Sequence, residues 1–196
     1  QAFTIREYGA GRGTLARQIA AAISASGQPG LEQVRYQLVD LAQGDDEPSE
    51  EFGRFEGVVI ANEFLDALPF HRLVFQAGEL REIYTALRDG WFVDQVGPLS
   101  DDLSGIDLDS LSLREGQRIE ISPKQGAWLR ELASELARGF VILIDYGYPR
   151  AELHDPERFP AGTLKTYRAH EVGEDPYFHL GRQDITAHVD FTAVAE

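Results

Sequence analysis

The stretch Phe3–Arg17, FTIREYGAGRGTLAR, decides the fold that we expect for this chain. Residues 3–8 have the pattern of a short strand, and the apolar residues that follow the turn have the spacing of one helix face over residues 12–25. These apolar residues are Leu15, Ile19, Ala22 and Ile23. Between strand and helix, Gly9, Gly11 and Gly13 allow sharp backbone bends and leave main-chain N–H groups open to a ligand. The stretch therefore predicts a ligand-binding corner around which the rest of the chain is organised.

The glycine spacing distinguishes between two kinds of cofactor. A dinucleotide-binding turn has the pattern G-x-G-x-x-G, but Thr14 occupies the position of its third glycine. The stretch from Glu7 to Gly13 instead resembles the E-x-G-x-G-x-G pattern of class I S-adenosylmethionine methyltransferases. A second acid, Asp40, ends the next expected strand over residues 34–41 and could accept hydrogen bonds from both ribose hydroxyls. Asp40 as a helix cap or a solvated strand end is an equally good interpretation, and an NAD-dependent oxidoreductase is a weaker alternative for the chain.

Composition narrows the class of protein. The chain has 196 residues and 43% hydrophobic content, which suffices for one α/β domain with a buried core. A formal net charge of −15 argues against a nucleic-acid partner, because phosphate binding needs clustered Lys and Arg. Acidity favours a basic peptide or protein, although it more often only keeps a protein soluble. The chain has no cysteine, which excludes disulfides and thiolate metal sites, and no apolar run or signal peptide that predicts membrane insertion.

The middle of the chain alternates between buried and exposed patterns. Residues 43–56 are polar and predict a loop, whereas residues 57–61 are a continuous apolar run, typical of a central parallel strand buried on both faces. Residues 72–96 contain three short apolar stretches and an Asp-Gly turn signal, so we expect an antiparallel hairpin insertion. Residues 97–115 are acidic and short of aromatics, so we expect a mobile loop.

The second half predicts one more helix and one more buried strand. Residues 118–121 alternate as a strand does, and Ser122 with Pro123 and Gln125 forms a clear helix start. We expect this helix to end at Gly139 and to bury Leu129, Leu132, Ala133 and Leu136. Residues 140–144 then predict a fully buried strand. The order of elements indicates a doubly wound, Rossmann-like α/β sheet within a single domain over residues 1–196.

Several motifs resemble, in the same order, those of the MidA-like family of S-adenosylmethionine-dependent methyltransferases. They are EYGAGRGTL at 7–15, ANEFLDALP at 61–69, EISP at 120–123, IDYGY at 144–148, GTL at 162–164 with His170, and DITAHVDF at 184–191. That family includes the mitochondrial complex I assembly factor that methylates an arginine of a partner subunit. The resemblance implies a class I methyltransferase fold, S-adenosylmethionine as cofactor, and a protein substrate, possible examples being respiratory complex I subunits. It also implies a bacterial cytoplasmic or a mitochondrial matrix location.

The chain departs from the family pattern in three ways. It has no region before the glycine motif and no strands after DITAHVDF, and it starts at Gln1 without containing any methionine, so we expect a fragment whose sheet is incomplete at both ends. The region of the third strand, after Asp40, is compressed. Arg6 occupies a position where the family has an apolar residue.

The resemblance also implies a set of cofactor-binding residues. These are Glu7, Gly9, Ala10, Gly11 and Gly13 around the methionine moiety, Asp40 at the ribose, and Asn62 near the adenosyl or methionine end.

Candidate catalytic residues follow from the demands of an arginine acceptor. A guanidinium has a pKa above about 12, so carboxylates must orient it and offset its charge. Glu63 and Asp66, three residues apart, would project to one side of a helix; alternatively, Asp66 caps a turn and Glu63 faces solvent. His188 is a possible base of the acceptor pocket, although such a histidine is more often structural. His170, His188 and Asp190 do not have the spacing of a complete ligand set, so we expect no metal site.

Two functions remain open from the sequence. The first is an S-adenosylmethionine-dependent protein methyltransferase that acts on arginine. The second is a non-catalytic assembly or scaffold module that keeps the cofactor pocket and docks a partner subunit on the aromatic residues of the 72–96 insertion. Asp145 and Tyr146 either line the acceptor side or belong to the core. The oligomeric state stays open.

Overall fold

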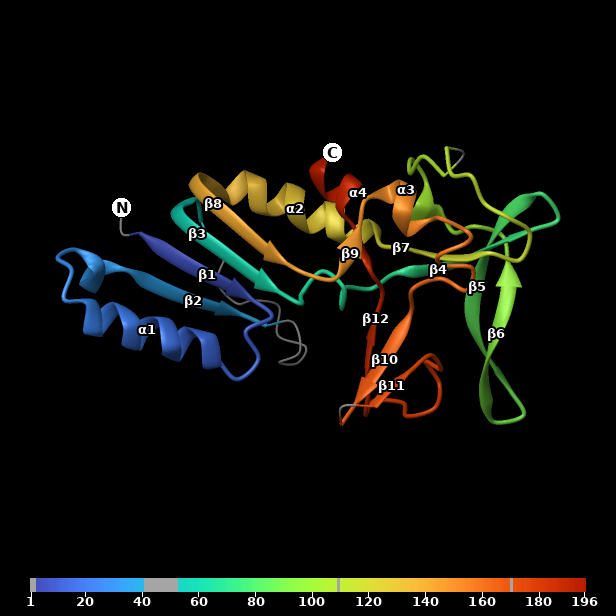
Figure 1. Cartoon of the computed structure of the whole chain (residues 1–196), viewed down its shortest axis with the longest axis horizontal. Coiled ribbons are helices and arrows are strands. Elements are labelled where there is room, and N and C mark those ends of the chain that lie inside the picture. Colours follow the sequence, from blue (N-terminus) through green and yellow to red (C-terminus); the bar gives the residue numbers. More distant parts are fainter. Residues whose placement is uncertain (1–2, 41–52, 109, 170) are drawn as a thin grey trace. The chain divides into compact units, whose positions relative to one another are not determined.

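The protein is described by a computed structural model over residues 3–40, 53–108, 110–169 and 171–196 (Figure 1). It divides into two compact units, each described by itself below. Unit 1 comprises Gln1–Leu65 and Trp128–Asp145, and unit 2 comprises Asp66–Ala127 and Tyr146–Glu196. The single-domain organisation over residues 1–196 therefore stays a prediction.

Unit 1 is built on a four-stranded parallel sheet with the order β2-β1-β3-β8. Its strands are β1 (Thr4–Tyr8), β2 (Arg35–Val39), β3 (Phe55–Asn62) and β8 (Leu136–Ile144). Helix α1 (Thr14–Ser26) and the short 3-10 helix η1 (Leu31–Gln33) connect β1 to β2, and helix α2 (Pro123–Glu135) precedes β8. This arrangement confirms the predicted doubly wound α/β class, since parallel neighbours need helical crossovers.

The core of unit 1 lies between the sheet and the second half of α2. Phe55, Val59 and Leu132 are its buried residues, and Tyr8, Trp128 and Leu136 pack against them. The same region contains the unexpected Arg6, whose side chain is 1% exposed. Its guanidinium forms an ion pair with Glu135, donates a hydrogen bond to Gln37 at 3.1 Å, and lies 4.0 Å from the ring centre of Phe55. The buried charge of Arg6 is therefore balanced by Glu135, and its guanidinium also has contacts with Gln37 and Phe55.

Four details of unit 1 correct the sequence-based predictions. The strand predicted to be fully buried, β8, is an edge strand in which Phe140 is 74% and Ile144 is 54% exposed, because among the described strands only β3 pairs with it. The helix predicted to run to Gly139 ends at Glu135, and Gly139 lies inside β8, where a Cβ would be 1.7 Å from the carbonyl oxygen of Gly57. In α1 no residue is fully buried, and Ala22 is exposed. Of the predicted polar loop, residues 43–52 lie outside the described residues, and residues 55–56 belong to β3.

Unit 2 contains a four-stranded antiparallel sheet with the order β6-β5-β4-β7. Its strands are β4 (His71–Gln76), β5 (Glu79–Arg88), β6 (Trp91–Gly97) and β7 (Arg118–Ile121). The turn between β5 and β6 has φ of 51° at Asp89 and 83° at Gly90, as a type I′ hairpin requires. The predicted antiparallel insertion at 72–96 is therefore present, and the strand at 118–121 joins it.

The acidic segment after β6 contributes apolar residues to the core of unit 2. It contains the short 3-10 helix η2 (Asp101–Leu103), and Leu103 and Leu108 are buried with Leu73 and Ile119. The acidic composition of the segment gave no indication that these two leucines are buried. Its mobility stays a prediction.

The rest of unit 2 consists of short elements. Strands β10 (Lys165–Arg168), β11 (Glu171–Gly173) and β12 (Asp184–Thr186) form a small antiparallel sheet, and β9 (Gly147–Tyr148) pairs in parallel with β13 (Val189–Asp190). Helices α3 (Arg150–Leu153) and α4 (Phe191–Ala195) each follow one strand of that pair. Among the described residues, no helix is long and apolar enough to cross a membrane.

Candidate functional site

The predicted cofactor residues of unit 1 lie along one edge of the parallel sheet. Tyr8, the last residue of β1, pairs with Val39 of β2 and with Ala61 of β3. Since these strands run in the same direction, the glycine turn, Asp40 and Asn62 all follow carboxyl ends at this edge. Ligands of open α/β sheets bind beyond the carboxyl ends of the strands. Unit 1 therefore brings three separate segments with predicted cofactor residues to one edge of the sheet, which we call the cofactor-binding edge after that prediction.

The glycine turn adopts the backbone conformation that its sequence predicts. Gly9, Gly11 and Gly13 have φ of 67°, 50° and 65°, which is the left-handed region that side chains with a Cβ rarely adopt. The N–H of Gly9 donates to the carbonyl of Val39 at 2.9 Å, which ties the turn to β2. Apart from Gly11 itself and its two chain neighbours, no atom of the described residues lies within 4 Å of a Cβ built on Gly11. The turn thus presents bare backbone toward open space at its middle glycine.

Glu7 is buried just before the turn and holds two strands together. Its carboxylate accepts a hydrogen bond from the Tyr36 hydroxyl of β2 at 2.7 Å. Burial of Tyr36, followed by the nearby Glu7 carboxylate, raises the pKa of that hydroxyl, so it stays a donor. The sequence pattern does not reveal this partner. A contact of Glu7 with the cofactor stays a prediction.

The segment after β3 also lies at the cofactor-binding edge. Glu63 is exposed and has φ of 48°, and its N–H donates to the carbonyl of Ile144 at 2.8 Å. The N–H of Leu65 donates to the carboxylate of Asp145 at 2.8 Å. Residues 63–69 form bends and a turn, so the helix on which Glu63 and Asp66 would share a face is not formed. Asp145 instead has a definite role, since it fixes this segment to the end of β8.

Three aromatic rings surround the base of the glycine turn, and sequence reasoning did not single them out. Tyr8, Phe64 and Trp128 have ring-centre separations of 5.0 to 5.5 Å. A Cβ on Gly9 would lie 3.3 Å from Cδ2 of Phe64, so the rings leave little space behind the turn. The local sequence gives no signal for this cluster, because Tyr8 directly follows Glu7 and Phe64 directly follows Glu63. The cluster supports the turn from one side.

The other two candidate catalytic residues belong to unit 2. Asp66 is buried, and its carbonyl accepts a hydrogen bond from the N–H of Ala187 at 3.0 Å. The next residue, His188, is half-buried, and its N–H donates to Oγ1 of Thr163 at 3.1 Å. Its ring packs at 5.6 Å from Tyr148 and 5.8 Å from Phe159. Unit 2 thus brings Asp66 close to the 184–191 motif.

Two further motifs meet at a buried carboxylate. Glu120 accepts hydrogen bonds from the backbone N–H of Thr163 at 2.6 Å and from its hydroxyl at 3.0 Å. A Cβ on Gly162 would lie 2.4 Å from Oε1 of Glu120, so only glycine fits there. Burial raises the pKa of Glu120, although the hydrogen bonds from Thr163 counteract it. The EISP and GTL motifs therefore form one structural contact. Within the described residues, no group of three or more acids and histidines is arranged to hold a metal ion; His170 lies outside them.

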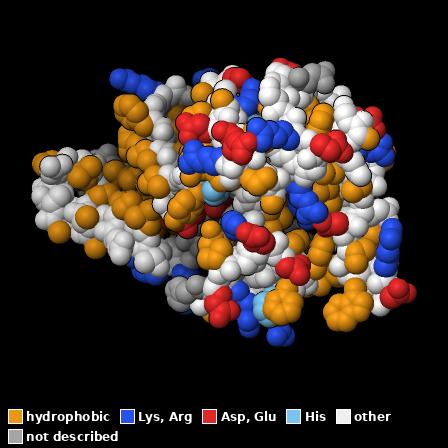
Figure 2. Space-filling model, turned by 45° about the vertical axis from the view of Figure 1, so that its right-hand side comes forward, with side chains coloured by type: hydrophobic (Ala, Val, Ile, Leu, Met, Phe, Trp, Pro, Cys, Tyr) orange, Lys and Arg blue, Asp and Glu red, His pale blue; other side chains and the backbone are white. Residues whose placement is uncertain are grey.

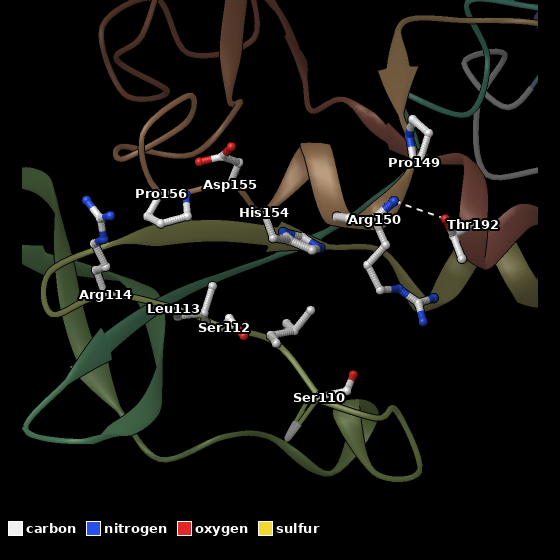
Figure 3. A pocket seen from close by; sticks show the side chains of 12 residues that line it. Ser110, Ser112, Leu113, Arg114, Pro149, Arg150, His154, Asp155, Pro156 and Thr192 are labelled. Carbon is white, nitrogen blue, oxygen red and sulfur yellow. Dashed lines mark hydrogen bonds between the residues drawn. The ribbon is translucent and has the colours of Figure 1, made fainter.

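A large pocket lies in unit 2, and none of the predicted site residues line it (Figure 3). Its volume is about 870 Å³, and residues 110–114, 149–151, 154–156 and Thr192 line it. The Arg150 guanidinium is bound by Asp190 at 2.8 Å and by Glu196 at 3.0 Å. His154 is buried, and burial lowers its pKa. Because the acids already neutralise the Arg150 cation, the pocket offers no free charge there, and we assign it no role.

Comparisons with known proteins agree on one class of protein. Residues 43–196 match the model of a family described as "Putative S-adenosyl-L-methionine-dependent methyltransferase". The mitochondrial protein arginine methyltransferase NDUFAF7 homolog of Caenorhabditis elegans is 32% identical over 142 residues, which are 68% of this chain and 31% of that protein. NDUFAF7 of Xenopus laevis is 28% identical over 146 residues, 67% of this chain and 29% of that protein. The chain therefore spans about a third of the length of these curated relatives.

Two solved structures from Burkholderia thailandensis have the same fold. One is bound to S-adenosyl-homocysteine and matches with a TM-score of 0.80 and 32% identity, covering 98% of this chain and 54% of that chain. The other matches with a TM-score of 0.78 and 30% identity, covering 100% of this chain and 56% of that chain. The family match begins after the glycine turn, at residue 43, whereas the structural matches cover nearly the whole chain.

Proposed function

Because the chain belongs to the family described as "Putative S-adenosyl-L-methionine-dependent methyltransferase", we propose that the protein transfers a methyl group from S-adenosylmethionine to an arginine side chain of a partner protein. S-adenosylmethionine is the cofactor of this family. The observation that carries the proposal is the cofactor-binding edge of unit 1, where the glycine turn, Asp40 and Asn62 follow the ends of adjacent parallel strands. The arginine acceptor is supported by the names of the C. elegans and Xenopus relatives.

The residues at this edge fit the cofactor that the family uses. The positive φ values of the three glycines and the empty space beside Gly11 leave room for a ligand against the backbone. The half-buried Asp40 follows the end of β2, where a carboxylate can accept hydrogen bonds from ribose hydroxyls. Asn62, exposed at the end of β3, offers both an amide donor and an acceptor. We assign the methionine moiety to Glu7 and residues 9–13, the ribose to Asp40, and the adenosyl or methionine end to Asn62.

The cofactor supplies an electrophilic methyl carbon on a sulfonium sulfur. During transfer, the acceptor nitrogen forms the new bond to carbon, the carbon–sulfur bond breaks, and S-adenosylhomocysteine leaves while the nitrogen loses a proton. The protein must align the acceptor and exclude water. We propose that the exposed Glu63 orients the guanidinium, because a carboxylate can accept two of its hydrogen bonds. Asp66 and His188 are our candidates in unit 2 for the acceptor side.

The proposal also includes a location and a partner. The names of the relatives include the word mitochondrial, which supports a mitochondrial location. We propose the matrix or, if the protein is bacterial, the cytoplasm. The resemblance to the MidA-like family points to a subunit of respiratory complex I as the protein substrate.

The proposal is tested by calorimetric titration of the full-length protein with S-adenosylmethionine and S-adenosylhomocysteine, with NADH as the control ligand. We expect saturable binding of the first two and none of NADH. Absence of binding by the first two would remove the methyltransferase interpretation. Binding of NADH alone would favour an oxidoreductase.

A matched pair of variants then tests the acceptor role of Glu63. Glu63→Ala should bind the cofactor normally and fail to methylate arginine, because only the acceptor side has changed. Glu56→Ala removes another exposed glutamate, near the opposite end of β3, and should retain both properties. Normal methylation by Glu63→Ala would show that the residue has been assigned wrongly.

A scaffold function is the second candidate, and one observation favours it. The hairpin of β5 and β6 exposes two aromatic residues, Trp91 at 76% and Phe92 at 42%. Exposed aromatic side chains are common in protein interfaces. If the full-length protein binds a partner but Gly11→Val, which fills the cofactor space, leaves the biological function intact, the scaffold function is the correct one.

A further inference from the structure

The antiparallel sheet of unit 2 has an edge whose backbone is unpaired in the described part of the chain. Strand β6 pairs only with β5, in a continuous register from Arg88–Trp91 to Glu82–Gly97. In a two-residue hairpin the residues that flank the turn form the first hydrogen-bonded pair, and such pairs then alternate. The bonds to β5 therefore fall at Trp91, Val93, Gln95 and Gly97. The N–H and C=O groups at positions 92, 94 and 96 point away from the sheet.

This edge has none of the usual features that prevent another strand from pairing. Proteins protect free edges with lysine, proline, bulges or inward-pointing charges. Strand β6 contains no lysine or proline, and its register is unbroken. Its one charge, Asp94, is held on the face of the sheet by Arg72 and by the Tyr177 hydroxyl at 2.8 Å. At the opposite edge, by contrast, the N–H of Arg118 in β7 donates to the carbonyl of Pro160 at 3.1 Å.

The side chains at positions 92, 94 and 96 lie beside pockets that a partner could fill. Phe92, Asp94 and Val96 share one face of the sheet with Ile83, because residues opposite one another in a ladder point to the same side. Two pockets flank Ile83 on this face. One, of about 440 Å³, includes Phe92, and the other, of about 320 Å³, includes Asp94 and Val96. Phe92 is 42% and Val96 is 46% exposed, and Figure 2 shows hydrophobic side chains lying between charged ones on the molecular surface.

The charges near the end of β6 select the kind of partner. The segment that follows the strand exposes Asp101, Asp102 and Asp107. The chain as a whole has a formal net charge of −15. A second copy of β6 paired antiparallel about Asp94 would set two Asp94 side chains opposite one another, and one paired in parallel and in register would also bring these acidic regions side by side. Like charges directly opposite destabilise a ladder, whereas opposite charges stabilise it. A basic segment is therefore the complementary occupant.

We propose that β6 is the docking edge for an extended, basic segment of the partner protein, which adds a strand to the sheet and places alternate apolar side chains in the two pockets. Main-chain hydrogen bonds give such strand addition its affinity, and the pockets give it specificity. The proposal rests on the proposed function only in taking this partner to be the methylated protein.

The test measures residue-resolved amide hydrogen exchange of the full-length protein with a synthetic peptide. The peptide has about nine residues, enough to span the whole of β6, with valine at alternate positions and arginine between them. We expect the outward amides of Phe92, Asp94 and Val96 to exchange at least about tenfold more slowly with the peptide, because they become hydrogen-bonded. A peptide with glutamate in place of arginine should give no protection. Absence of protection at these amides at millimolar peptide, or protection confined to β2 or β8, would overturn the proposal.

Two variants at one position separate the backbone from the side chain. Val96→Pro removes an outward N–H and leaves the hydrogen bonds to β5 intact, a substitution that edge strands tolerate. Val96→Thr keeps the N–H and the β-branched shape. We expect Val96→Pro to weaken peptide binding at least about tenfold, and Val96→Thr to change it by less than about threefold. Equal binding by the two variants would also contradict strand addition.

Cofactor titration distinguishes this inference from the proposed function. All β6 variants should bind S-adenosylhomocysteine as the unmodified protein does. Peptide protection at β6 without any cofactor binding or methyl transfer would remove the proposed function and leave the docking edge in place. If Val96→Pro methylates a protein substrate with the same KM as the unmodified protein, the docking edge is wrong and the proposed function stays in place.

Discussion

Replacement of Gly11 by alanine tests the cofactor-binding edge at its most exposed point. Gly11 has φ of 50°, and no described atom lies within 4 Å of an added Cβ, so the substitution creates no clash within the protein. The left-handed conformation costs a residue with a Cβ about 1–2 kcal/mol. Gly27, at the end of α1, has φ of 60° and equally open surroundings. Gly27→Ala therefore carries the same backbone strain at a position away from the turn.

The two variants should lose similar stability but differ in ligand binding. Urea unfolding should show a decrease of about 1–2 kcal/mol for both. Calorimetry should show that Gly11→Ala weakens S-adenosylhomocysteine binding by at least about tenfold, or 1.4 kcal/mol, because a methyl group occupies space that the ligand needs. Gly27→Ala should bind the ligand as the unmodified protein does. If Gly11→Ala is folded and binds within about twofold of the unmodified protein, the cofactor does not lie against this glycine.

Three further predictions concern buried polar groups. Glu135→Gln should destabilise the protein by about 3–5 kcal/mol because it leaves the buried Arg6 guanidinium uncompensated, while Arg6→Met combined with Glu135→Leu should cost much less in urea unfolding. The free energy of unfolding should decrease as pH falls below about 6.5, because burial lowers the pKa of His154 in the folded protein and the unfolded chain therefore binds the proton first. The slope from this one group is at most about 1.4 kcal/mol per pH unit, and His154→Leu should remove it. Tyr36→Phe should leave the buried Glu7 without its donor and cost about 1–3 kcal/mol, measured by thermal unfolding; an unchanged melting temperature would show that water replaces the hydroxyl.

Much of the fold could be predicted because local patterns determined it. The strand, turn and helix at the start of the chain follow from the glycine spacing, and the hairpin of β5 and β6 follows from Asp89-Gly90, whose positive φ values only a few residues tolerate. Burial of β8 was predicted wrongly because an apolar run looks the same in a central strand and in an edge strand. Whether a neighbour covers it depends on the topology. The end of α2 was also placed wrongly, since Gly139 serves the close approach of β8 to Gly57 rather than a helix cap.

Only those features of the site that lie within one continuous segment of the chain could be predicted from the sequence. Sequence order places Gly11, Asp40 and Asn62 after strands, and the parallel register then brings them to one edge. The partners of these residues come from elsewhere in the chain. The Tyr36 hydroxyl that holds Glu7, and the Asp145 carboxylate that holds the segment after β3, are separated from their partners by 29 and 80 residues. No local pattern contains such pairs.

The motifs outside the glycine turn show why a resemblance cannot assign chemistry residue by residue. Glu120 and Thr163 belong to two separate motifs, yet their main interaction is with each other, in a buried contact that excludes any side chain at position 162. His188, from a third motif, donates its backbone N–H to the same Thr163 and packs its ring against Tyr148 and Phe159. A substitution at any of these residues would disturb the fold of unit 2 before it reported on catalysis. Glu63 is different, because it is exposed and its side chain is not part of this packing. Loss of methylation in Glu63→Ala therefore has a chemical meaning that the same result in Glu120→Ala or His188→Ala would lack.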